Sequence, residues 1–219
     1  MIRVMIVDDQ EMIRQGLRAI LAGNDRIEVV TDVADGYQAV EVARTDQIDI
    51  ILMDIRMPGI DGVETIRRIR EFAPAETVKI IVLTTFDHDA TVLTALQAGA
   101  NGFLSKAVSP TELATGIEAV ASGGGALSGS AAASVISRVS EQPVRTVDAA
   151  LAARFSALTP REREVVIAAA AGKSNTEIAS DMFLSPFTVK THAGRAMIKV
   201  GARDRAQLIV FAYQAGLIA

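Results

Sequence analysis

Five side chains that could do chemistry follow short apolar runs in the first half of the chain. Two carboxylates, Asp8 and Asp9, follow the first run, and a third, Asp54, follows another. Thr84 and Lys106 come at the ends of two later runs. If these runs are parallel strands, their carboxyl ends meet at one edge of a sheet, and we expect the five side chains to lie together there. Clustered carboxylates repel one another unless a cation neutralises them, and their oxygens suit Mg2+ as the cofactor.

Such a cluster is suited to accepting a phosphoryl group. A cation beside Asp54 would screen the incoming negative charge, and the carboxylate could attack phosphorus and form an acyl phosphate. Lys106 could pair with the new charge, and the Thr84 hydroxyl could donate a hydrogen bond to a phosphoryl oxygen. The first turn reads VDDQEMIRQG where a nucleotide-binding domain has its GxGxxG loop, which argues against a nucleotide phosphate site.

The apolar runs have the length and spacing of strands in an α/β domain. They are rich in valine and isoleucine, and they span Ile2–Val7, Glu28–Val33, Ile48–Met53, Val78–Leu83 and Gly102–Ser105. Amphipathic stretches at helical spacing lie between them. This alternation predicts a doubly wound, five-stranded parallel sheet of the flavodoxin-like (βα)5 type over residues 1–123.

Residues 124–155 are expected to form a linker that is partly helical. The run GGGALSGSAAAS at residues 123–134 is dominated by glycine, serine and alanine, which is typical of a flexible connection. Within the linker, short helices are expected over Val135–Val139 and Val147–Phe155.

Residues 156–219 have the start signals of four short helices. Capping boxes begin helices at Thr159 and Ser174, and Ser185 followed by proline begins a third. A fourth helix is expected over Arg203–Gln214. Two short helices joined by a tight turn within a four-helix unit predict a small all-α helix-turn-helix domain.

The third of these helices, Pro186–Val200, has the pattern of a recognition helix. Lys190, Thr191 and Arg195 fall away from its apolar stripe, where they could enter the major groove of DNA. The apolar residues at helical spacing are Val189, Ala193, Ala196 and Met197. Taken alone, the pattern also fits an ordinary amphipathic surface helix.

Composition and charge narrow the class of protein. The chain has 219 residues, of which 50% are hydrophobic and 22% charged, so wholesale disorder is excluded. It has no cysteine, which excludes a disulfide framework and a thiolate metal site. With no signal peptide and no apolar run of about 18 residues, we expect a cytoplasmic protein without a membrane partner. The charge is −8 over residues 1–123 and +3 over residues 156–219, which suggests two domains with different partners.

Residues 1–122 resemble the receiver domain of two-component response regulators. The motifs are the acidic pair, MDIRMPGIDG, VLTTFD and GFLSKAVSP. The resemblance implies that Asp54 is the phospho-acceptor, and that Asp9, Asp54 and the backbone carbonyl of Arg56 bind Mg2+. Asp8 would act mainly through a metal-bound water.

The same resemblance assigns the parts of a switch. Thr84 is the switch hydroxyl by family spacing, although the neighbouring Thr85 is equally placed if only proximity is considered. Phe103 is the switch aromatic, with plain core packing as the alternative. Lys106 contacts the phosphoryl group, and Arg56 and Phe86 occupy positions that tune the lifetime of the acyl phosphate.

Residues 156–219 resemble the LuxR-type helix-turn-helix, through TPRERE, SNTEIA, TVKTH and ARDRAQ. The resemblance implies that six residues contact DNA bases or phosphates, namely Ser185, Thr188, Lys190, Thr191, His192 and Arg195. For His192, packing at the side of the helix is an equal alternative. Gly194 stands where the family often has a longer polar residue, which removes one base contact and costs roughly 1 kcal/mol of helix stability.

Together the two halves resemble a NarL/FixJ-type response regulator. That resemblance implies a sensor histidine kinase as phosphoryl donor, double-stranded promoter DNA as ligand, a homodimer formed through the last helix when phosphorylated, and RNA polymerase as a further candidate partner. It implies no turnover enzyme. An aspartyl-phosphate phosphohydrolase of the haloacid dehalogenase type needs a second Asp two residues after the nucleophile, where this chain has Arg56. The other two alternatives are a ligand-sensing LuxR-type regulator and a degenerate receiver that dimerises without phosphate.

Overall fold

The computed structural model of the chain describes residues 1–84, 91–123, 126–127 and 148–218. The chain divides into two compact units, Met1–Ala126 and Leu127–Ala219. The helix expected over Val135–Val139 lies outside the described residues. No helix in the described part of the chain is long and apolar enough to cross a membrane.

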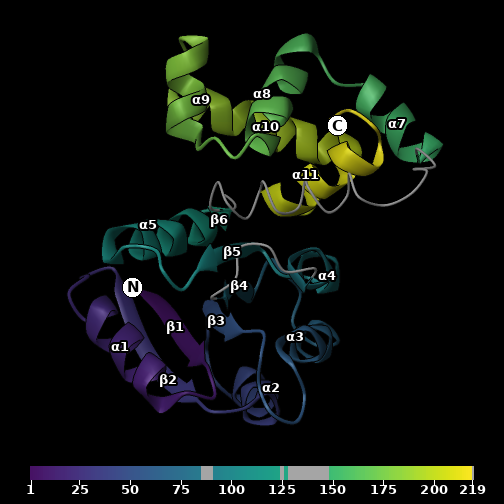
Figure 1. The fold of residues 1–219 in the computed structure, drawn as a ribbon. Helices are drawn as coiled ribbons and strands as arrows, with labels where there is room; N and C mark the ends of the chain where they lie inside the picture. The colour runs from purple at the N-terminus through teal and green to yellow at the C-terminus, as the bar shows by residue number, and fades with distance from the viewer. Residues whose placement is uncertain (85–90, 124–125, 128–147, 219) are drawn as a thin grey trace. The chain divides into compact units, whose positions relative to one another are not determined.

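The first unit is built on a parallel sheet, as the alternating pattern predicts (Figure 1). Its strands are β1 (Ile2–Val7), β2 (Ile27–Val33), β3 (Ile50–Asp54), β4 (Lys79–Thr84) and β5 (Gly102–Ser105). Their order is β2-β1-β3-β4-β5, and a two-residue strand, β6 (Ala126–Leu127), follows β5 at the edge. The strand order reverses between β1 and β3, which is where open α/β sheets bind ligands.

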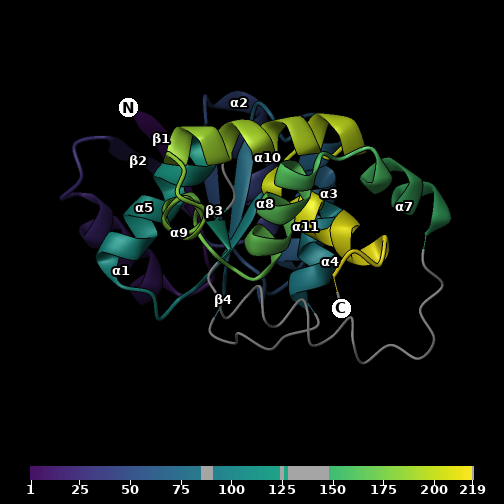
Figure 2. The same ribbon diagram turned by 90° about the horizontal axis from the view of Figure 1, so that it is seen from above.

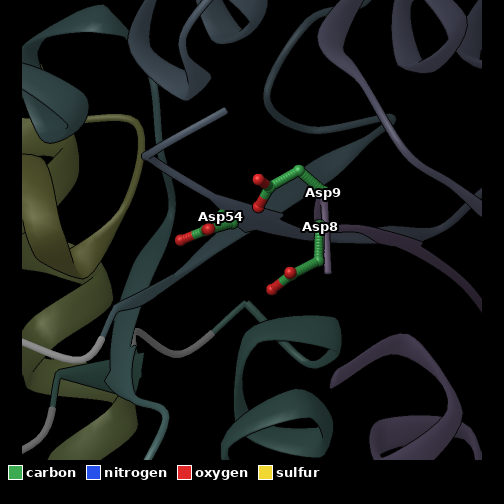
Figure 3. Close-up of side chains that lie close together, drawn as sticks. All are labelled: Asp8, Asp9 and Asp54. Atoms are coloured by element: carbon green, nitrogen blue, oxygen red, sulfur yellow. The ribbon is translucent and has the colours of Figure 1, made fainter. Parts of the chain in front are cut away.

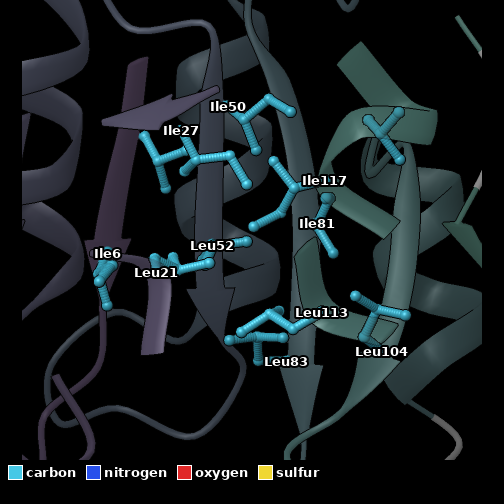
Figure 4. Packing of buried hydrophobic residues seen from close by; sticks show 12 residues of the cluster. Ile6, Leu21, Ile27, Ile50, Leu52, Ile81, Leu83, Leu104, Leu113 and Ile117 are labelled. Carbon is cyan, nitrogen blue, oxygen red and sulfur yellow. The ribbon is translucent and has the colours of Figure 1, made fainter. Parts of the chain in front are cut away.

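Helices cover both faces of this sheet. They are α1 (Glu11–Leu21), α2 (Gly36–Thr45), α3 (Gly62–Arg70), α4 (Thr91–Ala98) and α5 (Pro110–Ala121). Every residue of β3 is buried, as expected for a central strand with helices on both sides. Figure 4 shows how Leu113 and Ile117 of α5 pack with Leu52 and Ile81 of the sheet. This packing fixes the strand ends where the polar side chains lie.

The second unit is a helical domain in which the predicted capping boxes form. Its helices are α7 (Ala149–Ser156), α8 (Pro160–Ala170), α9 (Asn175–Met182), α10 (Pro186–Val200) and α11 (Arg205–Gln214). The side chains of Thr159 and Ser174 cap α8 and α9, and a glutamate three residues later returns each hydrogen bond. Figure 2 shows the long α10, which packs against α8, α9 and α11.

The second helix expected in the linker is present. The segment expected as a linker helix is α7, and its Leu151 and Phe155 pack in the same core as Val166 and Leu208. The carboxylate of Asp148 caps α7. These contacts move the proposed end of the linker from residue 155 to before Asp148, and the other limits, 1–123 and 156–219, stay predictions.

A partly buried ion pair joins the start of α8 to α10. Glu162 is only 3% exposed, and its Oε2 lies 2.7 Å from Nζ of Lys199 and accepts a hydrogen bond of 2.9 Å from the Thr159 backbone. Burial acts to raise the pKa of the Glu162 carboxyl, but the hydrogen bonds from Lys199 and Thr159 outweigh it, and this pKa is lowered. The ionised form of Glu162 therefore stabilises the fold.

We predict that Glu162→Gln lowers the free energy of unfolding by about 1–3 kcal/mol at pH 7, because Lys199 loses its charged partner. The folded-state pKa lies below the unfolded value, so this stabilisation is present above that unfolded pKa and is lost as the pH falls through the folded one. Calorimetric unfolding of both proteins at pH 7 and below pH 4 measures this. Glu177→Gln, at the same position of the exposed capping box of α9, should have a smaller effect. A stability difference between Glu162→Gln and the parent that does not change with pH would contradict the assignment.

Candidate functional site

Three carboxylates meet at the carboxyl edge of the sheet (Figure 3). Asp8 and Asp9 directly follow β1, and Asp54 is the last residue of β3. The two strands are paired neighbours, with Val7 opposite Met53, so their ends are adjacent. One oxygen of each carboxylate lies within 4.8 Å of the others. Asp8 and Asp54 are buried, whereas Asp9 is exposed, so the cluster has an open side.

The other two predicted residues come to the same edge. Nζ of Lys106, the residue after β5, lies 2.6 Å from Oδ2 of Asp8 and 3.1 Å from Oδ2 of Asp54. Thr84 is the buried last residue of β4 and pairs with Ser105 of β5. The backbone N–H of Lys106 donates a 2.6 Å hydrogen bond to the Thr84 carbonyl, which joins the ends of β4 and β5.

Burial and charge compete at this cluster. Burial raises the pKa of Asp54, although the charge of Lys106 acts to lower it. Burial acts to lower the pKa of Lys106, but its hydrogen bond to Asp8 and the charge of Asp54 raise it overall. Lys106 therefore stays a cation. The Asp54 Oδ1 atom accepts a 2.8 Å hydrogen bond from the Ile55 backbone, so Oδ2 is the oxygen that faces Lys106.

The charge balance of the cluster fits a divalent cation. Three carboxylates, when ionised, face one ammonium group, which leaves two negative charges. All the side-chain ligands are hard oxygens, and the exposed Asp9 leaves room for waters, which Mg2+ retains when it binds. Arg56, whose carbonyl is a predicted ligand, lies in the loop directly after β3.

Sequence reasoning missed Gly62, the first residue of α3. Its backbone N–H donates a 2.9 Å hydrogen bond to the Ile55 carbonyl. A Cβ atom on Gly62 would lie 2.3 Å from the Asp54 carbonyl oxygen and 2.8 Å from Cα of Ile55. The helix therefore packs directly on the backbone of Asp54. The Asp61-Gly62 pair is visible in the sequence as a helix start, but its closeness to Asp54 is not.

Arg14 of α1 is a second residue that the sequence did not reveal. Its Nη1 donates a 2.8 Å hydrogen bond to the backbone carbonyl of Asp8, and its Nε lies 3.1 Å from Oδ1 of Asp32. The Asp8 Oδ1 atom accepts a 2.9 Å hydrogen bond from the Gln10 backbone. These contacts fix the backbone and the carboxylate of Asp8 at the end of β1.

The predicted switch residues are only partly described. Phe103 is fully buried in β5, opposite Val82 of β4. Thr85 and Phe86 lie outside the described residues. The buried ring is compatible both with a switch residue and with plain core packing.

The helix α10 has an exposed polar face and a buried apolar face, as predicted. Lys190 and Arg195 are exposed, and Thr191 and His192 are half-buried. Met197, which was expected in the buried stripe, is only half-buried. The buried residues of the helix are Val189, Ala193, Ala196 and Val200.

The start of α10 is held by a hydroxyl pair. Ser185 is the N-cap residue, and its Oγ accepts a 3.0 Å hydrogen bond from the Thr188 backbone. The two hydroxyl oxygens of Ser185 and Thr188 lie 2.8 Å apart. Ser185 and Thr188, which are predicted to contact the DNA backbone, therefore lie at the N-terminus of α10. Backbone N–H groups without a partner in the helix favour an anion there.

A buried arginine, also missed from sequence, connects α11 to the start of α9. Nη1 of Arg205 donates a 2.8 Å hydrogen bond to Oδ1 of Asn175, and Nη2 donates to the Lys173 carbonyl. Burial lowers the pKa of Arg205 to about 10. The expected helix over Arg203–Gln214 begins at Arg205, because the carboxylate of Asp204 accepts a hydrogen bond from the Gln207 backbone and caps it.

Comparisons with known proteins match both units. Residues 4–118 match the response regulator receiver domain, and residues 156–212 match the luxR family of bacterial regulatory proteins. The transcriptional regulatory protein LiaR of Bacillus subtilis is 37% identical over 219 residues, which cover 100% of both chains.

Two solved structures of response regulators are also similar. The response regulator ChrA of a heme-sensing two-component system has a TM-score of 0.53 at 34% identity, with 99% of this chain and 98% of that chain covered. A structure of two RcsB dimers bound to two parallel DNAs has a TM-score of 0.56 at 26% identity, with 96% of each chain covered.

The acidic strand-end cluster, the helix-turn-helix unit and these full-length similarities agree with one another. The chain therefore belongs to the NarL/FixJ-type response regulators of two-component systems, DNA-binding proteins that join a receiver domain to a LuxR-type helix-turn-helix domain and control transcription.

Proposed function

We propose that this regulator is switched by phosphorylation of Asp54, with a sensor histidine kinase as the donor. The observation that carries the proposal is the position of Asp54 Oδ2. It lies at the end of the central strand, 3.1 Å from the Lys106 ammonium and beside two further carboxylates. The chemistry needs a carboxylate nucleophile, a cation site and a fixed positive charge at one place, and this edge of the sheet holds all three.

In the transfer step, Asp54 Oδ2 forms a bond to phosphorus as the bond from phosphorus to the imidazole nitrogen of the kinase breaks. Asp8, Asp9, Asp54 and the Arg56 carbonyl would hold Mg2+, which supplies charge neutralisation when bound. Lys106 then exchanges its contact with the Asp54 carboxylate for one with a phosphoryl oxygen. Because the product stays on the chain, the protein catalyses its own phosphorylation without being a turnover enzyme.

The switch follows from two residues next to the cluster. The Thr84 hydroxyl moves toward a phosphoryl oxygen, and the Phe103 ring follows into the space behind it. Both residues lie on neighbouring strands whose ends are joined through the Lys106 backbone, so their motions are coupled. The face of α4, β5 and α5 repacks, and the change is passed to the helical unit.

The output is binding of promoter DNA by a homodimer. Lys190, Thr191 and Arg195 of α10 enter the major groove, with His192 beside them, and the hydroxyls of Ser185 and Thr188 contact the phosphate backbone. The helix α11 is the proposed dimer contact. A solved structure at 26% identity contains RcsB dimers bound to DNA, which supports DNA binding by a dimer. We place the protein in the cytoplasm with bacterial promoter DNA, where RNA polymerase is a further candidate partner.

The first test is Asp54→Asn, which should abolish phosphorylation because the amide is not a nucleophile. Incubation of the full chain with acetyl phosphate and Mg2+, followed by intact-protein mass spectrometry, should show one added phosphoryl group on the parent protein and none on the variant. EDTA should prevent the reaction. Asp46→Asn, which changes an exposed carboxylate at the end of α2, should be phosphorylated at the parental rate. Phosphorylation of Asp54→Asn at the parental rate, or indifference to EDTA, would rule the assignment out.

Gly62→Ala should slow phosphorylation roughly 100-fold, because its methyl group would push the Asp54 backbone away from its position. The same acetyl phosphate assay measures the rate. Gly16→Ala is the matched control, since a Cβ atom there meets nothing within 4 Å; it should be phosphorylated normally and raise helix stability by about 1 kcal/mol. Equal phosphorylation rates for the two alanine variants would show that Gly62 does not position Asp54.

A further inference from the structure

An exposed aromatic side chain stands at the start of the recognition helix. Phe187 is the second residue of α10, and 78% of its surface is exposed. The core of the helical unit is made by other faces of the helix, so Phe187 does not serve the fold. Phe187 is one of several exposed large apolar residues in the described part of the chain, and its place at the start of the proposed recognition helix makes it a candidate for contact with a partner.

The face that begins with Phe187 continues through Thr191 and Gly194. These three residues are spaced four and three positions apart, so they lie on one side of the helix. The Thr191 hydroxyl donates a 3.0 Å hydrogen bond to the Phe187 carbonyl, so its hydrogen is used within the helix. The polar capacity of this strip is therefore low.

Gly194 has no reason inside the protein to be glycine. A Cβ atom built there meets no other atom within 4 Å, although glycine inside a helix costs roughly 1 kcal/mol relative to alanine. A glycine at this position would allow another molecule to approach the helix backbone closely. Phe187 and Gly194 then belong to one surface, with a projecting ring at one end and a backbone without a side chain about two turns further on.

The charges around the strip identify its occupant. Lys190 and Arg195 are exposed on either side of it, and residues 156–219 carry a net charge of +3, which suits the phosphates of DNA. The apolar group that the major groove presents to a protein is the C5-methyl group of thymine. Building on the proposed DNA contact of α10, we propose that Phe187 and the Thr191–Gly194 face read thymine methyl groups in the promoter site, with Phe187 as a specificity-determining residue.

A second exposed apolar residue on α10 provides an internal control. Ile198 is 82% exposed and lies one turn beyond Gly194. Helix-turn-helix proteins contact base edges with the first turns of the recognition helix, so Ile198 lies past the part that reads bases. Truncation of Ile198 should therefore leave the reading of thymine unchanged.

The test compares thymine with deoxyuridine, which differs only in the missing methyl group. A duplex is selected from a random library with the phosphorylated full chain, and a second copy is synthesised with deoxyuridine in place of thymine. The parent protein should bind the thymine duplex about fourfold more tightly for each methyl group contacted, the factor that corresponds to about 0.8 kcal/mol. Phe187→Ala should lower this ratio of affinities, because the methyl contacts of the ring are lost, while Ile198→Ala keeps the parental ratio.

Two further variants separate this inference from the proposed DNA contact of α10. Lys190→Ala should weaken binding to both duplexes by a similar factor and keep their ratio. Gly194→Ala should raise the unfolding temperature yet weaken binding, because the added methyl group keeps the helix out of the groove. Equal affinity of the parent for both duplexes, or an unchanged ratio in Phe187→Ala while Lys190→Ala weakens binding, would overturn the reading of thymine alone. No effect of Lys190→Ala or Phe187→Ala on either duplex would overturn the DNA contact of α10 as well.

Discussion

One ammonium group shared by two buried carboxylates is the interaction on which the receiver site depends. Lys106 follows β5, yet its Nζ contacts both Asp8, which follows β1, and Asp54 at the end of β3. Breaking such a buried pair by removing one partner would leave an uncompensated charge, which typically costs about 3–5 kcal/mol. In the proposed mechanism, a phosphoryl group on Asp54 would supply a new partner for the same ammonium and so change the contact that joins three strand ends.

The strand order requires the Lys106 side chain to reach across the sheet to contact both carboxylates. β1 and β5 are separated by β3 and β4, and neighbouring strands lie about 4.8 Å apart. Only a long side chain that starts at the end of β5 reaches the carboxylates that follow β1 and β3. The backbone bond from Lys106 to Thr84 fixes where that side chain starts.

In the helical unit, buried polar contacts orient the recognition helix. Glu162 holds the second half of α10 through Lys199, and Arg205 holds the start of α9 through Asn175. Each bond joins helices that are far apart in sequence. The face of α10 that begins with Phe187 lies away from this core, and it is the face that we propose contacts DNA.

Local signals in the sequence predicted much of this structure, and long-range contacts supplied the rest. A strand that is buried on both faces is visible in the sequence as an apolar run. A capping box is a pattern within four consecutive residues, as at Thr159. The approach of Gly62 to Asp54 and the reach of Arg205 depend on how separate elements pack, and no local pattern encodes them. β6 has two residues and is too short to show a period, which is why five strands were expected. The helix α7 follows a segment rich in glycine and serine, and only its packing shows that it belongs to the helical core.

In the proposed mechanism, the charge placed on Asp54 controls DNA binding by the helical unit. The most direct measurement is the affinity of the full chain for a selected promoter duplex with and without beryllofluoride, a phosphoryl mimic, in the presence of Mg2+. A coupling of about 1–3 kcal/mol predicts binding that is 5–150-fold tighter with the mimic, and by linkage the duplex should tighten binding of the mimic by the same factor. The Asp54→Asn chain should show no change. Equal affinity of the parent protein with and without the mimic would contradict the account.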